Sequence, residues 1–192
     1  DHLRKHIEAL VASKPRGSRL RIWSAGCSTG QEPYTIGMDL LGAFPELKRW
    51  DFKILATDID TAVIEKAARG IYPENELNGL SRERAAPFGK PGDGTIVIPE
   101  AVRNLVSFKP LNLIGAWPMK GPFDAVFCRN VAIYFDKPTQ GEVFGRFSKL
   151  MAPEGYLYIG HSENLGSGGD GFRLVGKTIY QSKLKLNKQE AA

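Results

Sequence analysis

The segment from Arg21 to Met38 constrains the fold most, because a short apolar run leads directly into a loop of small residues and then into an amphipathic helix. The run contains Leu20, Ile22 and Trp23, which favour a strand. The loop is built from residues with little side-chain bulk, so a ligand can lie against bare backbone; these are Ala25, Gly26, Ser28, Thr29 and Gly30. Apolar residues then recur at helical spacing, namely Tyr34, Ile36, Met38, Leu40, Leu41 and Phe44. This layout is typical of a nucleotide-type pocket.

A second strand, FKILAT, runs from Phe52 to Thr57 and leads into Asp58 and Asp60. An acidic residue at the end of the second strand of an alternating β/α fold is where ribose hydroxyls are bound. The chain has no GxGxxG at the first loop, because three residues separate Gly26 from Gly30, and this argues against a pyrophosphate cradle. S-adenosylmethionine carries an adenosine and a charged amino acid but no phosphate, so it fits better. Glu32, close to the loop, is placed to meet its ammonium group.

Helical and strand patterns alternate along most of the chain. We expect helices over 2–12, 31–43, 61–69 and 138–150, and strands over 20–25, 52–57, 105–109, 123–128 and 156–160. Pro138 suits the first turn of the last helix and Gly155 its end. A closing antiparallel hairpin is expected from 172–175 and 178–182, joined by Gly176 and Lys177. The pattern predicts an α/β fold with a mixed sheet, helices on both faces and ligands at the carboxyl ends of the strands.

Length and composition narrow the class of protein. The 192 residues suffice for one α/β domain, and the irregular stretch 70–103 holds a tight GDG turn followed by TIVI, which suggests a hairpin. No apolar run approaches the roughly 20 residues of a membrane span, so we expect a cytoplasmic protein without membrane insertion.

The net charge of +5 favours an acidic partner, either nucleic acid or an acidic protein surface. Cys27 and Cys128 are expected to be reduced thiols, and His2 and His6 lack a third metal ligand.

Polar residues also follow the later strands, at the sheet edge expected to carry Gly26 and Asp58. Arg129 and Asn130 come directly after the strand FDAVFC, where they would face a bound ligand. The alternative for Arg129 is a structural pairing with a carboxylate such as Asp136. The convergence of several strand ends on one crevice favours the ligand-facing interpretation.

Two further polar groups occupy equivalent places. Asn112 follows the strand at 105–109 and is placed to read an adenine edge, although alone it is more typical of a turn. His161 follows the strand at 156–160, and a catalytic base is one interpretation. A hydrogen bond that orders the loop, from His161, Ser162 or Asn164, is the favoured one.

Five strings occur in order along the chain: RIWSAGCSTGQEPYTIGM, LATDID, FKPLNL, FDAVFCRNVAIYFD and GYLYIGHSEN. Together they resemble the chemotaxis receptor methyltransferases, the CheR family of protein-glutamate O-methyltransferases. The resemblance covers about residues 20–182, and the RNVxIYF and GHSEN strings are its most specific part. It implies a class I, Rossmann-like methyltransferase fold, S-adenosylmethionine as donor with S-adenosylhomocysteine as product, no metal, and receptor glutamates as acceptors.

The resemblance also implies roles for individual residues. Glu32 would bind the methionine ammonium and Asp58 the ribose hydroxyls, while Arg129 and Tyr134 would be the catalytic residues that face the acceptor. The full set of expected cofactor-binding residues is Ala25, Gly26, Ser28, Thr29, Glu32, Asp58, Ile59, Asn112, Leu113, Asn130 and Val131.

For domain organisation, the resemblance implies one catalytic domain over 1–192, with a small β-subdomain inserted at 72–103 and a flexible tail at 183–192. The family's amino-terminal helical domain is expected to be absent from this sequence. The implied partner is the cytoplasmic domain of methyl-accepting chemotaxis receptors, bound by a monomer.

Two other classes of function stay open at this point. A module that senses S-adenosylmethionine without turnover is opposed by the presence of Arg129, Tyr134, Glu32 and Asp58, and a radiolabel transfer assay separates the two. A nucleic-acid methyltransferase is favoured only by the basic charge. Amino-group methylation of bases relies on an Asp/Asn-Pro-Pro-aromatic motif after the fourth strand, and RNVA occupies that place. Tyr134 and Phe135 alone also make a poor platform for a flipped base.

Overall fold

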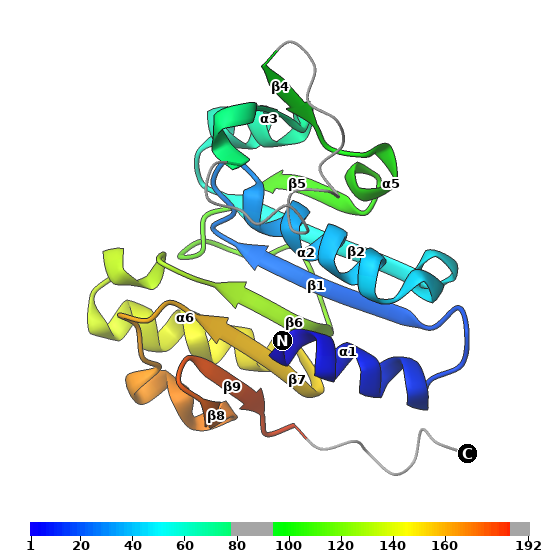
Figure 1. Cartoon of the computed structure of the whole chain (residues 1–192). Coiled ribbons are helices and arrows are strands. Elements are labelled where there is room, and N and C mark those ends of the chain that lie inside the picture. Colours follow the sequence, from blue (N-terminus) through cyan, green and yellow to red (C-terminus); the bar gives the residue numbers. More distant parts are fainter. Residues whose placement is uncertain (78–93, 185–192) are drawn as a thin grey trace.

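One mixed sheet of seven strands forms the centre of the computed structural model, which describes residues 1–77 and 94–184 (Figure 1). The strand order is β5-β2-β1-β6-β7-β9-β8. The first five strands in this order run parallel, whereas β9 is antiparallel to both β7 and β8. Their bounds are β1 Arg19–Ala25, β2 Asp51–Asp58, β5 Val106–Pro110, β6 Phe123–Cys128, β7 Met151–Ile159, β8 Phe172–Gly176 and β9 Ile179–Ser182.

Helices cover both faces of this sheet. The α-helices are α1 His2–Ser13, α2 Gln31–Ala43, α3 Thr61–Arg69, α5 Glu100–Arg103 and α6 Lys137–Leu150. Short 3-10 turns are η1 Pro45–Arg49, η2 Glu74–Leu77, η4 Ala132–Tyr134 and η5 Gly166–Gly171. The predicted α/β class, with a mixed sheet and an antiparallel last strand, is confirmed.

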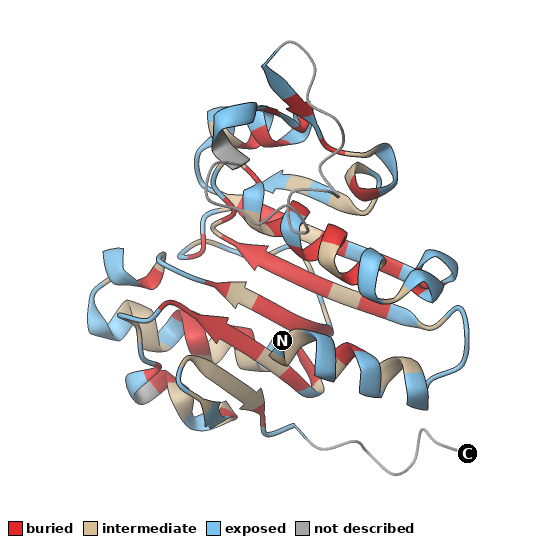
Figure 2. Ribbon diagram, viewed as in Figure 1, coloured by how far each residue is buried: buried red, intermediate tan, exposed pale blue. Residues whose placement is uncertain are grey.

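The alternation of side chains in β1 divides the core into two layers. Leu20 and Ile22 face the layer that α1 and α2 complete, and Trp23 and Ala25 face the layer that α6 completes. The central strands are therefore buried on both sides, while the helices keep exposed outer faces (Figure 2). This arrangement leaves the edges of the sheet, where the strands end, as the places open to a ligand.

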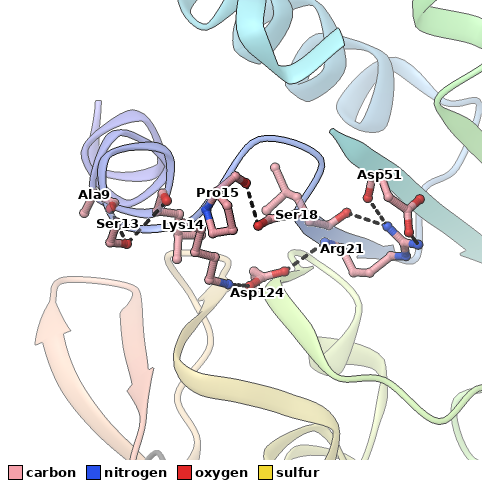
Figure 3. Close-up of polar contacts among 10 residues, drawn as sticks. Ala9, Ser13, Lys14, Pro15, Ser18, Arg21, Asp51 and Asp124 are labelled. Atoms are coloured by element: carbon pink, nitrogen blue, oxygen red, sulfur yellow. Dashed lines mark hydrogen bonds and ion pairs between the residues drawn. The ribbon is translucent and has the colours of Figure 1, made fainter. Parts of the chain in front are cut away.

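Asp124 ties together the edge at which the central strands begin (Figure 3). Its buried carboxylate accepts a hydrogen bond from the backbone N–H of Arg21 at 2.8 Å and lies 3.6 Å from the Lys14 ammonium. The Arg21 guanidinium in turn pairs with Asp51 at the start of β2. These contacts close the amino edge of β1, β2 and β6.

The two histidines of α1 pack on β7. His2 Nδ1 lies 3.0 Å from the Tyr158 hydroxyl, and the His6 ring makes an edge contact with Tyr156 at 4.7 Å between ring centroids. Burial lowers the pKa of both histidines. Across the two described ranges, no helix combines the length and the apolar character needed to cross a bilayer.

Three details differ from the sequence prediction. Gly155 does not end the last helix, because α6 stops at Leu150 and β7 starts at once with Met151. Gly155 instead lies within β7 beside a break in its register with β6, where a Cβ would come within 3.0 Å of the Asp124 carbonyl oxygen. The closing hairpin turns at residues 177–178, one residue later than expected.

The predicted insert at 72–103 is described only in part. β3 (Ile71–Pro73) pairs antiparallel with β4 (Thr95–Val97), so the TIVI strand has a partner at the start of the insert. Most of the predicted GDG turn lies outside the described residues, as do half of the insert (78–93) and residues 185–192 of the predicted tail.

Candidate cofactor and acceptor site

A cavity of about 620 Å³ opens at the carboxyl edge of the sheet. Four strand ends line it, those of β1, β2, β5 and β6. The lining residues are Gly26, Ser28, Asp58, Ile59, Leu111, Asn112, Leu113, Ile114, Arg129, Asn130, Val131, Tyr134 and Phe135. Asp58 and Arg129 therefore share one cavity, as the strand-end argument predicted.

The wall built from β1 and β2 presents backbone and a carboxylate. Gly26 has φ +85° and Ser28 has φ +49°, so the loop turns sharply in the left-handed region directly after β1. The Thr57 carbonyl accepts from the N–H groups of Gly26 and Cys27 at 2.8 and 2.9 Å. These bonds hold the loop against β2 and leave the backbone at Gly26 bare toward the cavity.

The Asp58 carboxylate orders both strand ends of this wall. Oδ2 accepts from the Ser28 N–H at 2.8 Å, and Oδ1 accepts from the Asp60 N–H at 3.1 Å. Asp60 itself begins α3 by accepting from the Ala62 N–H at 2.8 Å. Asp58 thus lies at the cavity surface with its position fixed by backbone donors.

The opposite wall is the segment after β6, from Arg129 to Phe135. Asn130 adopts φ +60°, which is uncommon for a residue with a side chain. The next residue, Val131, packs so closely over Gly26 that a Cβ on that glycine would lie 2.2 Å from Val131 Cγ2. The two walls therefore meet at Gly26.

Glu32 does not line the cavity, but it pairs with a residue that does. It accepts from the Ser24 hydroxyl at 2.8 Å, and Arg129 Nη1 donates to it at 3.3 Å. Burial raises the pKa of Glu32, and the Ser24 and Arg129 contacts oppose that shift. The alternative expected for Arg129, a pairing with a carboxylate, is therefore present, but the partner is Glu32 and not Asp136, which caps α6 by accepting from the Thr139 N–H at 2.9 Å.

All of the predicted site residues except Ala25, Thr29 and Glu32 line the cavity. Ala25 is the last residue of β1 and is buried in the core. The Thr29 hydroxyl donates to Gln31 at 2.8 Å, and its carbonyl accepts from Tyr72 at 2.7 Å. The binding and catalytic roles of the whole set stay predictions.

Asn112 combines both interpretations of its sequence position. Its Oδ1 accepts from the Ile114 N–H at 2.9 Å, which forms a turn, and the residue also lines the cavity. His161 is exposed, and the carboxylate that orders its loop belongs to Glu163, which accepts from the Gly160 N–H. Sequence reasoning missed Glu163, although its place in the GHSEN string just after β7 was a signal.

Sequence reasoning also missed three apolar lining residues, Leu111, Ile114 and Phe135. Each is a close neighbour, along the chain, of a polar residue that was chosen. A search for polar groups at strand ends passes over the apolar neighbours that complete a cavity.

Neither cysteine is placed to act as a nucleophile. Both are free thiols and buried, and burial together with Asp58 raises the pKa of Cys27 to about 12. Within residues 1–77 and 94–184, no group of three or more His, Cys, Asp or Glu side chains is arranged to hold a metal ion.

Residues 1–181 match the family described as the CheR methyltransferase, SAM binding domain. The chain belongs to this family. Its relatives include a probable chemotaxis protein methyltransferase of Rhizobium etli, 41% identical over 191 residues, which span 96% of this chain and 71% of that protein. The chemotaxis protein methyltransferase of Escherichia coli is 44% identical over 176 residues, covering 88% of this chain and 60% of that protein. The family predicted from the sequence is confirmed.

Solved structures show the same fold at low identity. A TehB-like SAM-dependent methyltransferase from Corynebacterium glutamicum superposes with a TM-score of 0.50 at 14% identity, covering 93% of this chain and 84% of that one. The DszA carbon methyltransferase also gives 0.50, at 17% identity, over 83% of this chain and 35% of that one. The class I methyltransferase fold implied by the CheR resemblance is therefore present.

Proposed function

We propose that this chain transfers a methyl group from S-adenosylmethionine to glutamate side chains of chemotaxis receptors, forming methyl esters and S-adenosylhomocysteine. The observation that carries the proposal is that Arg129 and Tyr134 line the same cavity as Asp58. Membership of the CheR family and the names of its relatives support the reaction class and its setting in chemotaxis.

The residues around the cavity fit the proposed donor. Gly26 lines the cavity without a side chain of its own and leaves room for Val131 to form the adjoining wall, and the Asp58 carboxylate suits a pair of ribose hydroxyls. The exposed side chains of Ile59 and Ile114, at 69% and 55%, offer apolar surface for a purine ring. Glu32, behind Arg129, provides negative charge for the methionine ammonium. Bound S-adenosylmethionine would supply a methyl group activated by its sulfonium charge.

A receptor glutamate needs alignment more than deprotonation. A glutamate side chain with a pKa of about 4.3 is already ionised at neutral pH, so this chain needs no general base. Arg129 can bind an acceptor carboxylate. One of its nitrogens already donates to the carboxylate of Glu32, while 46% of its side chain stays exposed. Arg129 holds one oxygen of the acceptor carboxylate and leaves the other free. Tyr134, 81% exposed, fixes the direction of approach through its hydroxyl.

The partner in this proposal is the cytoplasmic domain of a methyl-accepting receptor, and the chain acts on it as a monomer in the cytoplasm. The net charge of +5 favours association with an acidic segment that presents glutamates. The insert predicted at 72–103 is a candidate contact for such a partner.

The test measures transfer of radiolabelled methyl from S-adenosylmethionine to purified receptor cytoplasmic domains. We expect label that mild alkali releases as methanol, because methyl esters are base-labile whereas methylated amines are not. Label that resists alkali, or no label on the receptor domain, would contradict the proposed reaction.

Calorimetry of S-adenosylhomocysteine binding tests the donor site separately. Asp58→Ala is expected to weaken binding about tenfold or more, because it removes the proposed ribose contact and the Ser28 anchor together. Asp39→Ala is the matched control, because Asp39 pairs with Arg4 on the surface of α1 and α2. Equal affinity of the two variants would remove Asp58 from the site.

A further inference from the structure

Glu163 lies in the loop after β7, and its carboxylate accepts hydrogen bonds from three backbone N–H groups. Oε2 accepts from Gly160 at 2.5 Å and from Asn130 at 3.1 Å, and Oε1 accepts from Val131 at 3.0 Å. The donors come from two segments about 30 residues apart in sequence, the end of β7 and the wall of the cavity after β6. A single side chain therefore joins the two loops.

The backbone that Glu163 holds is the strained part of that wall. Asn130 has φ +60°, and Val131 closes over Gly26. Close packing surrounds the carboxylate as well, because a Cβ at Gly160 would lie 2.7 Å from Glu163 Oε2 and 3.0 Å from the Asn130 nitrogen. The site has room for the carboxylate only because residue 160 is a glycine.

We propose that Glu163 is a positioning residue of the donor cavity, holding the Asn130–Val131 backbone in the conformation that forms one wall and that places Arg129 and Tyr134 at its edge. Glu163 is not among the residues that line the cavity, so it acts through Asn130 and Val131. The part of this inference that concerns S-adenosylmethionine rests on the proposed function.

The three backbone N–H groups require a side chain with two acceptor oxygens and the length of glutamate. Glutamine keeps the length of the side chain but has only one oxygen, so at least one of the three N–H groups would face an amide NH2. Aspartate keeps both oxygens and the charge but is one methylene shorter, so it cannot reach all three donors from the same backbone. We therefore expect neither Glu163→Gln nor Glu163→Asp to bind all three N–H groups. The glutamine lacks an acceptor oxygen, and the aspartate lacks reach.

The experiment compares Glu163→Gln and Glu163→Asp with Glu154→Gln, an exposed control near the start of β7 at the opposite edge of the sheet. Amide hydrogen exchange measured by NMR without ligand is expected to accelerate about tenfold or more at Gly160, Asn130 and Val131 in both Glu163 variants. Elsewhere the exchange rates should stay those of the wild type. Calorimetry with S-adenosylhomocysteine should show binding about tenfold or more weaker in both variants and unchanged in the control.

Each outcome decides between the explanations. Unchanged exchange at the three amides would overturn the proposal, and so would variant proteins that bind S-adenosylhomocysteine like the wild type. Wild-type affinity in Glu163→Asp with loss in Glu163→Gln would also overturn it, because the charge alone and not the reach to all three N–H groups would then support binding. If the wild type itself fails to bind S-adenosylhomocysteine, the proposed function fails, while the exchange data still test whether Glu163 holds the wall.

Discussion

Replacing Gly26 with alanine should damage both the stability of the fold and the cavity. The new Cβ would lie 2.2 Å from Val131 Cγ2, against about 3.5–4.0 Å for a favourable carbon–carbon contact. At φ +85° a residue with a side chain adds backbone strain of about 1–2 kcal/mol, and overpacking adds about 1–3 kcal/mol. We therefore expect Gly26→Ala to lose about 2–5 kcal/mol of unfolding free energy and to push Val131 out of the cavity wall.

Urea unfolding measures this loss, with Gly145→Ala as the matched control. Gly145 lies within α6 and has nothing within 4 Å of a built Cβ, so its substitution should gain about 0.5–1 kcal/mol from helix propensity. Adding Val131→Ala to Gly26→Ala removes the clashing methyl group, and the double variant should recover the overpacking part but not the backbone strain. A Gly26→Ala protein with wild-type stability and wild-type affinity for S-adenosylhomocysteine would refute the reasoning.

Three further predictions concern the groups around the acceptor. Arg129→Ala should lower the rate of methyl transfer by roughly 10²-fold, the scale of one preorganised electrostatic contact, and a near-normal rate in the radiolabel assay would remove Arg129 from the site. Tyr134→Phe should lower kcat while calorimetry shows unchanged affinity for S-adenosylhomocysteine; weakened binding instead would place Tyr134 with the donor. Burial raises the pKa of Glu32 in the folded state, so ionisation of Glu32 disfavours the fold as the pH rises above its unfolded pKa of about 4.3. The stability of Glu32→Gln relative to the wild type, from urea unfolding, should therefore increase between pH 4 and pH 7, and a constant difference would contradict this assignment.

The sequence predicted the site because parallel strands bring their carboxyl ends to one edge. Residues 31–43 and 123–128 form α2 and β6 with the predicted bounds, since small residues and strand-end polar groups mark their limits. Asp58 and Arg129 are 71 positions apart, yet Asp58 ends β2 and Arg129 follows β6, and both strands neighbour β1 and run parallel to it. The alternation of helices and strands in the sequence, together with the shared direction of parallel strands, is sufficient to place both residues at one cavity.

Features that depend on contacts between distant segments were not predicted. The early start of β7 follows from pairing with β6, where Met151 opposes Phe123, and no local signal in MAPEG separates a helix end from a strand. The role of Glu163 depends on donors that the fold brings together from residues 130, 131 and 160. A glutamate in a polar loop has no periodicity that would distinguish such an acceptor from a solvated side chain.

The cavity lies where the order of strands in the sheet reverses, between β1 and β6, and the loop that follows each of these strands contains a left-handed residue that carries a side chain. Ser28 follows β1 and Asn130 follows β6, each at a strain of order 1–3 kcal/mol. A carboxylate from the next strand outward binds each N–H, Asp58 from β2 and Glu163 from the loop after β7. Asp58 faces the cavity and would share its oxygens with a ligand, whereas Glu163 lies outside the lining and can serve the backbone alone. The β6 wall is therefore preorganised without help from a ligand, and the β1 wall is the one whose hydrogen bonds binding would rearrange.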